Sequence, residues 1–455
     1  MNNPMQNMRL ARSFASKRTI FSFVRKSPWH LPCNSGPLIP NRELVDEEVC
    51  PGYDSRVFYP ARAGEVLAHR YQLLSKIGWG SQSTVWLARD VSRFKWESEQ
   101  TVALKIVNSN EFDAAQYEKS IEDHIARQNP AHRGHAILRT CLDGFEIEGP
   151  DGRYMCLAYH PMREPFWIFQ RRFVSRKLPL PLAKAYIYVL LVGLDYLHSE
   201  CNVVHTGELR SFLSGFWLHI QSTLTTFINK GEPMDYKTCP ETGRTVYRCH
   251  NNFGPLDVKQ IAIMVPQLVD FGLVARLDKE QLGIIPIQPD HYFAPEVILG
   301  CGWNSKADIW NMGVLLWNII GNTELFQQVH DTDSLYTAKP HLAEMVALLG
   351  PPPTQLIARS DIMAQHDWPE PVRGATGKLC SNGREFFGGP FFNEEGDFLH
   401  EDLMPTRALQ DTIPFVDEKD RASFLDFAQG MLTWLPEDRK SAGELMKHPF
   451  LKLHG

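Results

Sequence analysis

With 455 residues, the chain is too long for one ordinary compact core and suits two or three domains. Hydrophobic residues make up 43%, which excludes a chain that is disordered throughout. The net charge of -6 gives no general reason to expect nucleic-acid binding. The nine cysteines form no CxxC pair, which favours reduced intracellular thiols over a zinc site. The longest apolar run, Ala185 to Leu194, is far shorter than a bilayer span, so we expect no transmembrane helix.

Residues 1–50 have the composition of a basic, flexible N-terminal arm. No acidic residue precedes Glu43, and serines are interspersed among the basic residues Arg9, Arg12, Lys17, Arg18, Arg25, Lys26 and Arg42. This composition is typical of a mitochondrial presequence, but it also fits a disordered basic arm or an upstream extension that carries no address. Both interpretations stay open.

The order of the predicted elements indicates two lobes. Short β-branched runs bounded by turns predict strands, and apolar residues at helical spacing predict helices. The expected strands are 71–77, 84–89, 101–107, 137–145 and 154–159, with one helix at 112–126. After residue 161 the expected elements are helices, at 182–199, 305–320, 424–435 and 442–448. Strands followed by helices favour a small sheet-based lobe and a larger helical one.

A glycine-rich turn and a lysine indicate nucleotide binding in the first lobe. Gly78-Trp79-Gly80 lies between two predicted strands, where backbone amides can approach phosphate oxygens. A dinucleotide-binding fingerprint would open a helix at this point instead. Lys105 follows on the next strand, in Val-Ala-Leu-Lys, which fits the motif whose lysine pairs the α- and β-phosphates. Glu118 of the following helix is the expected carboxylate partner of that lysine, with Glu122 as the alternative.

Four further motifs follow in a fixed order. Asp270-Phe271-Gly272 comes after an apolar stretch and matches the motif in which the aspartate holds Mg²⁺. Ala294-Pro295-Glu296 begins 24 residues beyond Asp270, and Asp308 opens a predicted helix. Arg439, near the end of the chain, is the expected partner of Glu296.

With these motifs in place, the chain resembles a eukaryotic protein kinase from about residue 71 to residue 451. It is most similar to the SR-protein kinase family, in its short fungal form. The stretches that carry the resemblance are Pro51–Tyr53, Tyr59–Glu65, Gly80–Ala88, Tyr196–Glu200, His205–Thr206, Gln288–Tyr292 and Phe387–Phe392.

The resemblance implies an α+β, bilobal protein-kinase fold, with a small, mainly β N-lobe and a larger, mainly α C-lobe. The expected divisions are the arm at 1–50, the N-lobe with its N-terminal extension and hinge at 51–162, and the C-lobe at 163–455. Within the C-lobe, an extended segment at 214–265 would separate the catalytic loop from Asp-Phe-Gly. By resemblance, Tyr159 is the gatekeeper and residues 160–162 are the hinge that meets adenine.

The resemblance also implies the reaction, phosphoryl transfer from ATP to serines of Arg-Ser-rich proteins, with ATP and Mg as cofactors. It implies a monomer in the cytoplasm or nucleus, without a nucleic-acid or membrane partner. Lys105, Glu118 and Asp270 are then the catalytic candidates, with Asp270 as the metal ligand. The expected structural residues are His205, Glu296, Asp308 and Arg439. The expected ATP-binding residues are Ile77, Gly78, Trp79, Gly80, Ser83, Val85, Lys105, Tyr159 and Met162.

The catalytic loop departs from the kinase pattern. Counted from His205, the general-base aspartate and the metal-binding asparagine fall on Gly207 and Phe212, and the loop lysine falls on Leu209. Neither glycine, phenylalanine nor leucine has a group for those roles. Thr206 is no departure, because the SR-protein kinase family has threonine there. Glu208 is one residue away from the base position and should point elsewhere.

Two explanations of this loop stay open. One is a pseudokinase that binds nucleotide as a scaffold without transferring phosphate. The other is a frame error or misplaced intron, because residues 207–226 form one block that is unlike the family. Phe293 is a further departure, since the family commonly has arginine before Ala-Pro-Glu. An acidic run late in the large lobe could bind an Arg-rich substrate or simply be a solvated loop; its residues are Glu394, Glu395, Asp397, Glu401 and Asp402.

Overall fold

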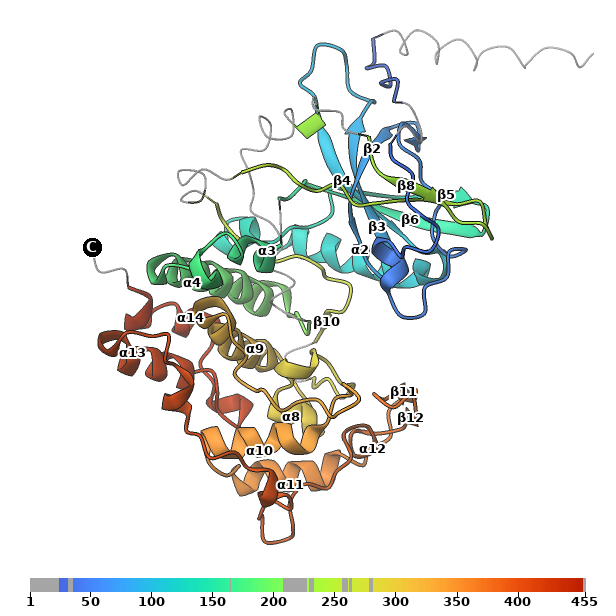
Figure 1. Ribbon diagram of the computed structural model, residues 1–455. Coiled ribbons are helices and arrows are strands. Elements are labelled where there is room, and N and C mark those ends of the chain that lie inside the picture. Colours follow the sequence, from blue (N-terminus) through green and yellow to red (C-terminus); the bar gives the residue numbers. More distant parts are fainter. Residues whose placement is uncertain are drawn as a thin grey trace, which may run out of the picture. The chain divides into compact units, whose positions relative to one another are not determined.

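The computed structural model describes residues 24–31, 36–163, 165–207, 227–228, 233–255, 261, 264–277 and 281–452. The chain divides into two compact units. Unit 1 comprises residues 1–116, 141–161 and 219–255, and unit 2 comprises residues 117–140, 162–218 and 256–455. Figure 1 labels elements of both units where there is room.

Unit 1 is built on a six-stranded antiparallel sheet with the order β1-β2-β3-β4-β6-β5 (Figure 1). Side chains on one face of the sheet, including Leu73, Trp86 and Leu104, form its buried core. The strands are β1 (Val66–Leu67), β2 (Tyr71–Trp79), β3 (Ser83–Asp90), β4 (Thr101–Val107), β5 (Asp143–Gly149) and β6 (Gly152–Tyr159).

The predicted strand at 137–145 begins too early. Residues 133–137 form a 3-10 turn, and β5 starts only at Asp143. In the turn, the ring of His132 accepts a hydrogen bond from the backbone N–H of Gly134 at 3.0 Å, which fixes a local helical start. The apolar residues after it therefore do not continue an extended strand.

A two-stranded hairpin from the segment before Asp270 also belongs to unit 1. It consists of β8 (Tyr236–Thr238) and β9 (Thr245–Tyr247), and the ring of Tyr247 packs edge-on against Trp86 of the sheet. The sequence prediction placed the whole of 163–455 in the C-lobe, whereas the structure places residues 219–255 in unit 1. It also places residues 117–140 in unit 2.

A buried charge network ties the hairpin to an acidic turn, Asp46–Val49. Glu47 is fully buried and contacts two cations, Lys76 Nζ of β2 and Arg244 Nη2 at 2.7 Å. Glu48 pairs with Lys237 of β8 at 2.7 Å. Part of the predicted flexible arm, residues 36–50, is therefore packed structure, because each buried acidic group meets a cation elsewhere in unit 1. Residues 1–23 and 32–35 lie outside the described residues.

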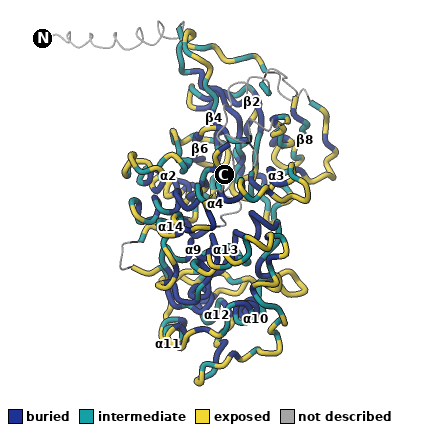
Figure 2. Tube along the Cα trace, turned by 90° about the vertical axis from the view of Figure 1, so that its left-hand side faces the viewer, coloured by how far each residue is buried: buried dark blue, intermediate teal, exposed yellow. Residues whose placement is uncertain are grey.

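Unit 2 is mainly helical, and its described strands are short. In Figure 2, α9 (Lys306–Leu316) carries the colour of buried residues, and every residue from Ala307 to Leu316 is buried. The other helices are α2 (Phe112–Arg127, which begins in unit 1), α3 (Phe166–Gln170), α4 (Leu180–Tyr196), α8 (Pro295–Ile298), α10 (Ala338–Leu349), α11 (Thr354–Met363), α12 (Gly383–Phe387), α13 (Glu418–Gln429) and α14 (Ala442–Leu445). The strands are β7 (Val203–Val204), β10 (Ala275–Arg276), β11 (Val372–Arg373) and β12 (Leu379–Cys380).

Two features of unit 2 bear on the sequence predictions. The helix predicted at 424–435 lies at 418–429 instead, and the apolar residues after it, Met431 and Leu432, are buried outside any helix.

The stretch Val174–Cys201 is long and apolar enough to span a membrane, and 61% of its most apolar window is buried within the protein. A core helix of a folded protein has the same properties, and the buried face of α4 packs into the core of unit 2.

Candidate active site

The glycine-rich turn and Lys105 lie in one row across the sheet of unit 1. Gly78 of β2 is paired with Val85 of β3, and Val85 is paired in turn with Lys105 of β4. A Cβ on Gly78 would lie 3.3 Å from the Val85 side chain, a tight contact, so glycine favours the close approach of β2 and β3 at this point. The predicted phosphate-binding turn and the predicted lysine are therefore cross-strand neighbours.

Asn108 fixes the tip of this turn. Its backbone N–H donates to the carbonyl of Gln82 at 2.9 Å, and its side-chain amide donates to the carbonyl of Ser81 at 3.2 Å. Gly80 N–H closes the turn on the carbonyl of Ser83 at 2.9 Å. The sequence analysis missed Asn108. The feature that could have indicated its role is an asparagine directly after β4, because a buried polar side chain needs hydrogen-bond partners.

The other predicted nucleotide-binding residues are divided between the units. Ile77 packs beside Leu87 in unit 1, and Tyr159 is buried at the end of β6. Met162 packs against the core of unit 2. Lys105 belongs to unit 1 and Glu118 to unit 2, so their pairing stays a prediction.

Asp270 is exposed and has a left-handed backbone, with φ at 64°. Such a conformation is uncommon outside glycine and is found where surrounding structure over-determines it, often at functional sites. The next residue, Phe271, is fully buried and holds the chain in the core of unit 2. A Cβ on Gly272 would lie 3.5 Å from a Glu118 carboxylate oxygen and 3.6 Å from an Asp270 oxygen. The Glu118 and Asp270 carboxylates therefore both lie close to Gly272 of the predicted metal-binding motif.

Asp308, at the start of α9, organises the chain around His205. Its carboxylate is fully buried and accepts the backbone N–H groups of His205 at 2.7 Å and Thr206 at 3.0 Å. The ring of His198 contacts the same carboxylate at 2.8 Å. Asp308 thus acts as the predicted structural residue, holding two consecutive backbone amides in place.

His205 and Thr206 connect this loop to the Asp270 motif. The buried ring of His205 lies edge-on to Phe271, and its Nε2 lies 3.3 Å from the carbonyl of Val269. Burial lowers the pKa of His205. Thr206 has φ at 59°, and its hydroxyl donates to the carbonyl of Leu273. Strands β7 and β10 pair just outside these contacts, so the loop and the metal motif are fixed to each other.

Gly207 follows Thr206 and is the last described residue of this loop. Its backbone is held on both sides, because its N–H donates to the carbonyl of His205 at 2.7 Å and its own carbonyl accepts from Asn311 at 3.1 Å. Neighbouring residues thus fix the backbone at this position, but glycine supplies no carboxylate there. Residues 208–226, including Leu209 and Phe212, lie outside the described residues.

Two amide side chains that the sequence analysis did not single out support this position. Gln288 has a backbone φ of 79°. Its side-chain Nε2 donates to Asn311 Oδ1 at 2.8 Å, and its side-chain Oε1 accepts the backbone N–H of Ala294 at 2.8 Å. Asn311 in turn donates to Gly207. The available sequence signals were the place of Gln288 in a stretch that resembles the family and a polar residue, Asn311, among the apolar residues of α9.

The predicted pair of Glu296 and Arg439 is present and buried. Two guanidinium nitrogens of Arg439 contact the two Glu296 oxygens at 2.7 and 2.6 Å, which is the bidentate geometry of strong pairs. Phe293, the departure noted in the sequence, packs edge-on against Tyr336 at 4.7 Å and Phe387 at 5.3 Å. An apolar cluster thus occupies the place of the expected arginine.

The described residues fit ATP and magnesium chemically. The backbone of the turn at Gly78–Gly80 and the ammonium of Lys105 suit phosphate oxygens, and the exposed carboxylate of Asp270 suits a hard divalent cation. A loop asparagine for a second metal is missing from the sequence at Phe212.

Comparisons with known proteins identify the family of the chain. Residues 235–451 match the protein kinase domain family. A serine/threonine protein kinase of Aspergillus fumigatus is 32% identical over 431 residues, which cover 93% of this chain and 95% of the relative. The serine/threonine-protein kinase SRPK of Physarum polycephalum is 25% identical, over 89% of this chain and 91% of that protein. The crystal structure of the PF14_0431 kinase domain, at 20% identity, has a TM-score of 0.60 and covers 88% of this chain and 100% of that one, which supports the kinase fold. The chain therefore belongs to the serine/threonine protein kinase family.

Proposed function

We propose that this chain is an SR-protein-kinase-type member of the family, which binds Mg-ATP and Arg-Ser-rich protein substrates. The observation that carries the proposal is the arrangement of the nucleotide-binding candidates within each unit. Gly78, Val85 and Lys105 form one row in unit 1, and Asp270 stands on a strained, exposed turn in unit 2. The similarity to the Physarum kinase supports the SR-type assignment.

The substrate class is also supported by charge. The predicted acidic run after Phe392 is solvent-exposed at Glu394, Glu395, Asp397, Glu401 and Asp402. Exposed carboxylates attract arginine-rich segments over several ångströms at moderate salt. An Arg-Ser-rich protein is therefore the partner whose charge fits this surface.

A second candidate function, a nucleotide-binding scaffold that does not transfer phosphate, is favoured by Gly207. Its neighbours hold the backbone in place, yet no carboxylate is present to orient the substrate hydroxyl. General-base catalysis contributes about 10²- to 10⁴-fold to a rate, and the loop also lacks the lysine and asparagine. The chain as written is thus expected to bind nucleotide and to transfer phosphate very slowly.

Thermal denaturation with Mg-ATP tests nucleotide binding, which both candidate functions share. A ligand that binds only the native state raises its melting temperature by mass action. We expect millimolar Mg-ATP to raise the melting temperature of the chain and Lys105→Ala to abolish that rise. Lys95→Ala, in a loop before β4, is the matched control and should keep the rise. No shift for the unmodified chain would remove nucleotide binding from the proposal.

A further inference from the structure

Residues 24–31 lie on unit 1 as an extended segment. Arg25 forms an antiparallel bridge with Phe94. The N–H of Lys26 donates to the carbonyl of Arg93, and the N–H of Lys95 donates to the carbonyl of Val24, both at 2.9 Å. This is how a bound peptide adds backbone hydrogen bonds to an exposed edge.

The side chain of Gln72, in β2, recognises the backbone of the segment. It is fully buried, and its Oε1 accepts the N–H of Trp29 at 2.8 Å while its Nε2 donates to the Trp29 carbonyl at 2.7 Å. A buried amide must find partners for both of its ends. Here one extended residue of the N-terminal segment supplies a donor and an acceptor together.

Arg89 and Glu99 recognise side chains of the same segment. The guanidinium of Arg89, which is almost fully buried, lies 4.4 Å from the centre of the Trp29 ring and donates to the carbonyl of Ser27 at 2.8 Å. Glu99 pairs with Lys26 at 2.8 Å and also with Arg89 at 2.7 Å. Glu99 and Arg89 therefore bind a cation and an indole that are three residues apart in the segment.

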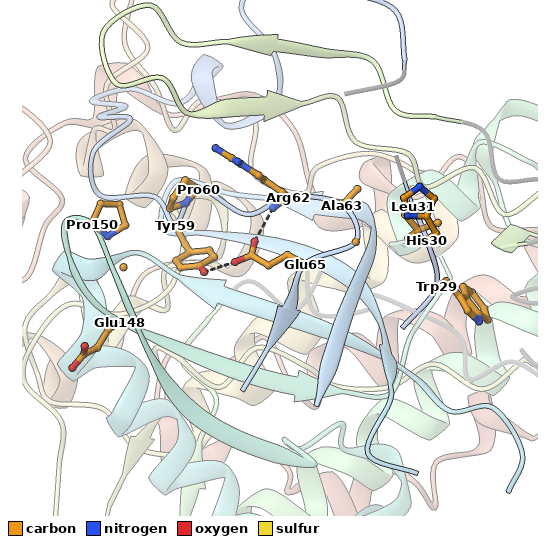
Figure 3. A pocket seen from close by; sticks show the side chains of 12 residues that line it. Trp29, His30, Leu31, Tyr59, Pro60, Arg62, Ala63, Glu65, Glu148 and Pro150 are labelled. Atoms are coloured by element: carbon orange, nitrogen blue, oxygen red, sulfur yellow. Dashed lines mark hydrogen bonds between the residues drawn. The ribbon is translucent and has the colours of Figure 1, made fainter. Parts of the chain in front are cut away.

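Beyond Trp29 the segment borders a cavity of about 670 Å³. Figure 3 shows His30 and Leu31 near Ala63, with Tyr59 and Glu65 directed toward each other; the Tyr59 hydroxyl donates to Glu65 at 2.6 Å. The hydrogen bonds and ion pair described above thus lie between Val24 and Trp29, and Trp29, His30 and Leu31 line the cavity.

We propose that Gln72, Arg89 and Glu99 form a peptide-binding site that residues 24–29 occupy as an intramolecular ligand. The site takes extended peptides with a lysine or arginine and, three residues later, a tryptophan. Its chemistry is a carboxylate for the cation, a guanidinium face for the indole and an amide for the backbone between them. A peptide of this kind exchanges with the chain's own segment.

The test uses the full-length chain with a protease site inserted between Leu31 and Gly36. After cleavage, a fluorescent peptide with the sequence of residues 24–31 is titrated in and its anisotropy is followed. We expect saturable binding to the cleaved chain and at least about ten-fold weaker binding to the uncleaved chain, whose tethered segment competes. A peptide with Trp29→Ala should bind about ten-fold more weakly than the parent.

A pair of charge variants keeps the test independent of folding. Glu99 is about half-exposed, so Glu99→Gln should leave the sheet intact. It should weaken binding of the parent peptide more than binding of a peptide with Lys26→Gln, because only the parent peptide loses the ion pair with Glu99, whereas both depend on Arg89 beside it. The proposal is overturned if the parent peptide does not bind the cleaved chain, or if the Trp29→Ala peptide binds it equally well.

Discussion

Replacing Glu47 by glutamine should loosen the contact between the acidic turn and the hairpin β8–β9. Burial opposes ionisation of Glu47, but Lys76 and Arg244 outweigh it, so the pKa of this carboxyl lies below its ordinary value. The ionised group is thus the native one at neutral pH. The variant leaves Lys76 and Arg244, which are both buried, without the anion that they share.

The magnitude follows from which contacts remain. Removing one partner of a buried ion pair typically costs about 3–5 kcal/mol, because it leaves a charge uncompensated. Lys76 keeps Asp46 at 3.0 Å and the carbonyl of Tyr247 at 2.8 Å, so we expect the lower end, about 3 kcal/mol. Glu43→Gln is the matched control in the same segment. Glu43 pairs with Arg248 at 2.7 Å, but both side chains are nearly half exposed, so its loss should cost about 0–1 kcal/mol.

Hydrogen exchange of the amides at 236–247 measures the effect where it occurs, and urea denaturation measures it for unit 1. A loss of about 3 kcal/mol corresponds to roughly 100-fold faster exchange when opening is rapid and reversible. Equal exchange rates in Glu47→Gln and Glu43→Gln would refute the view that the buried network holds the hairpin.

Two further predictions concern unit 2. His341 is buried beside Tyr336 and the rings of His291 and His330, and burial lowers its pKa to about 3. His341 therefore takes up a proton near pH 6.5 in the unfolded chain but stays neutral in the folded chain, so stability falls as the pH drops from about 6.5 to about 3, by about 1.4 kcal/mol per pH unit. In urea titrations at pH 7 and 4.5, His341→Gln should lose less stability on acidification than the wild type, while the exposed His366→Gln should lose as much; equal losses for all three would contradict the assignment. Arg439→Met leaves the fully buried Glu296 without its bidentate partner and should destabilise unit 2 by about 3–5 kcal/mol, whereas Arg359→Met, which breaks a partly exposed pair with Glu437, should change it by less than about 1 kcal/mol. Similar denaturation midpoints for these two arginine variants would show that burial does not set the cost.

Local patterns predicted the central sheet well, because β-branched runs separated by glycine and polar turns specify strands directly. The strands 71–79, 83–90 and 101–107 lie within a few residues of their predicted bounds. Partners distant in the sequence were harder to predict. Nothing near Glu47 indicates that its cations are Lys76 and Arg244, 29 and 197 residues away.

The same contrast between sequence patterns and distant partners applies to the residues of the candidate site. The pair of Glu296 with Arg439 was predicted from motifs whose order is fixed, and the structure contains it. His205 and Asp308 were predicted only as structural residues, and the hydrogen bond between them is seen in the structure alone. Asn108, Gln288 and Asn311 belong to no such motif, and each acts through hydrogen bonds to backbone that only the folded chain brings near. Glycine at 207 was visible in the sequence, but the hydrogen bonds that hold its backbone were not.

Phosphoryl transfer to an Arg-Ser peptide with labelled ATP tests the central claim most directly. The unmodified chain and a chain in which residues 207–226 are replaced by a family-like segment with aspartate, lysine and asparagine are compared under identical conditions. We expect no transfer above background from the unmodified chain, clear transfer from the replaced chain, and its loss on Asp270→Ala. Gly207→Asp alone should not restore transfer, because groups that act as a unit are not additive. Robust labelling by the unmodified chain that disappears on Asp270→Ala would contradict the account, and Glu208 would then be the first residue to substitute.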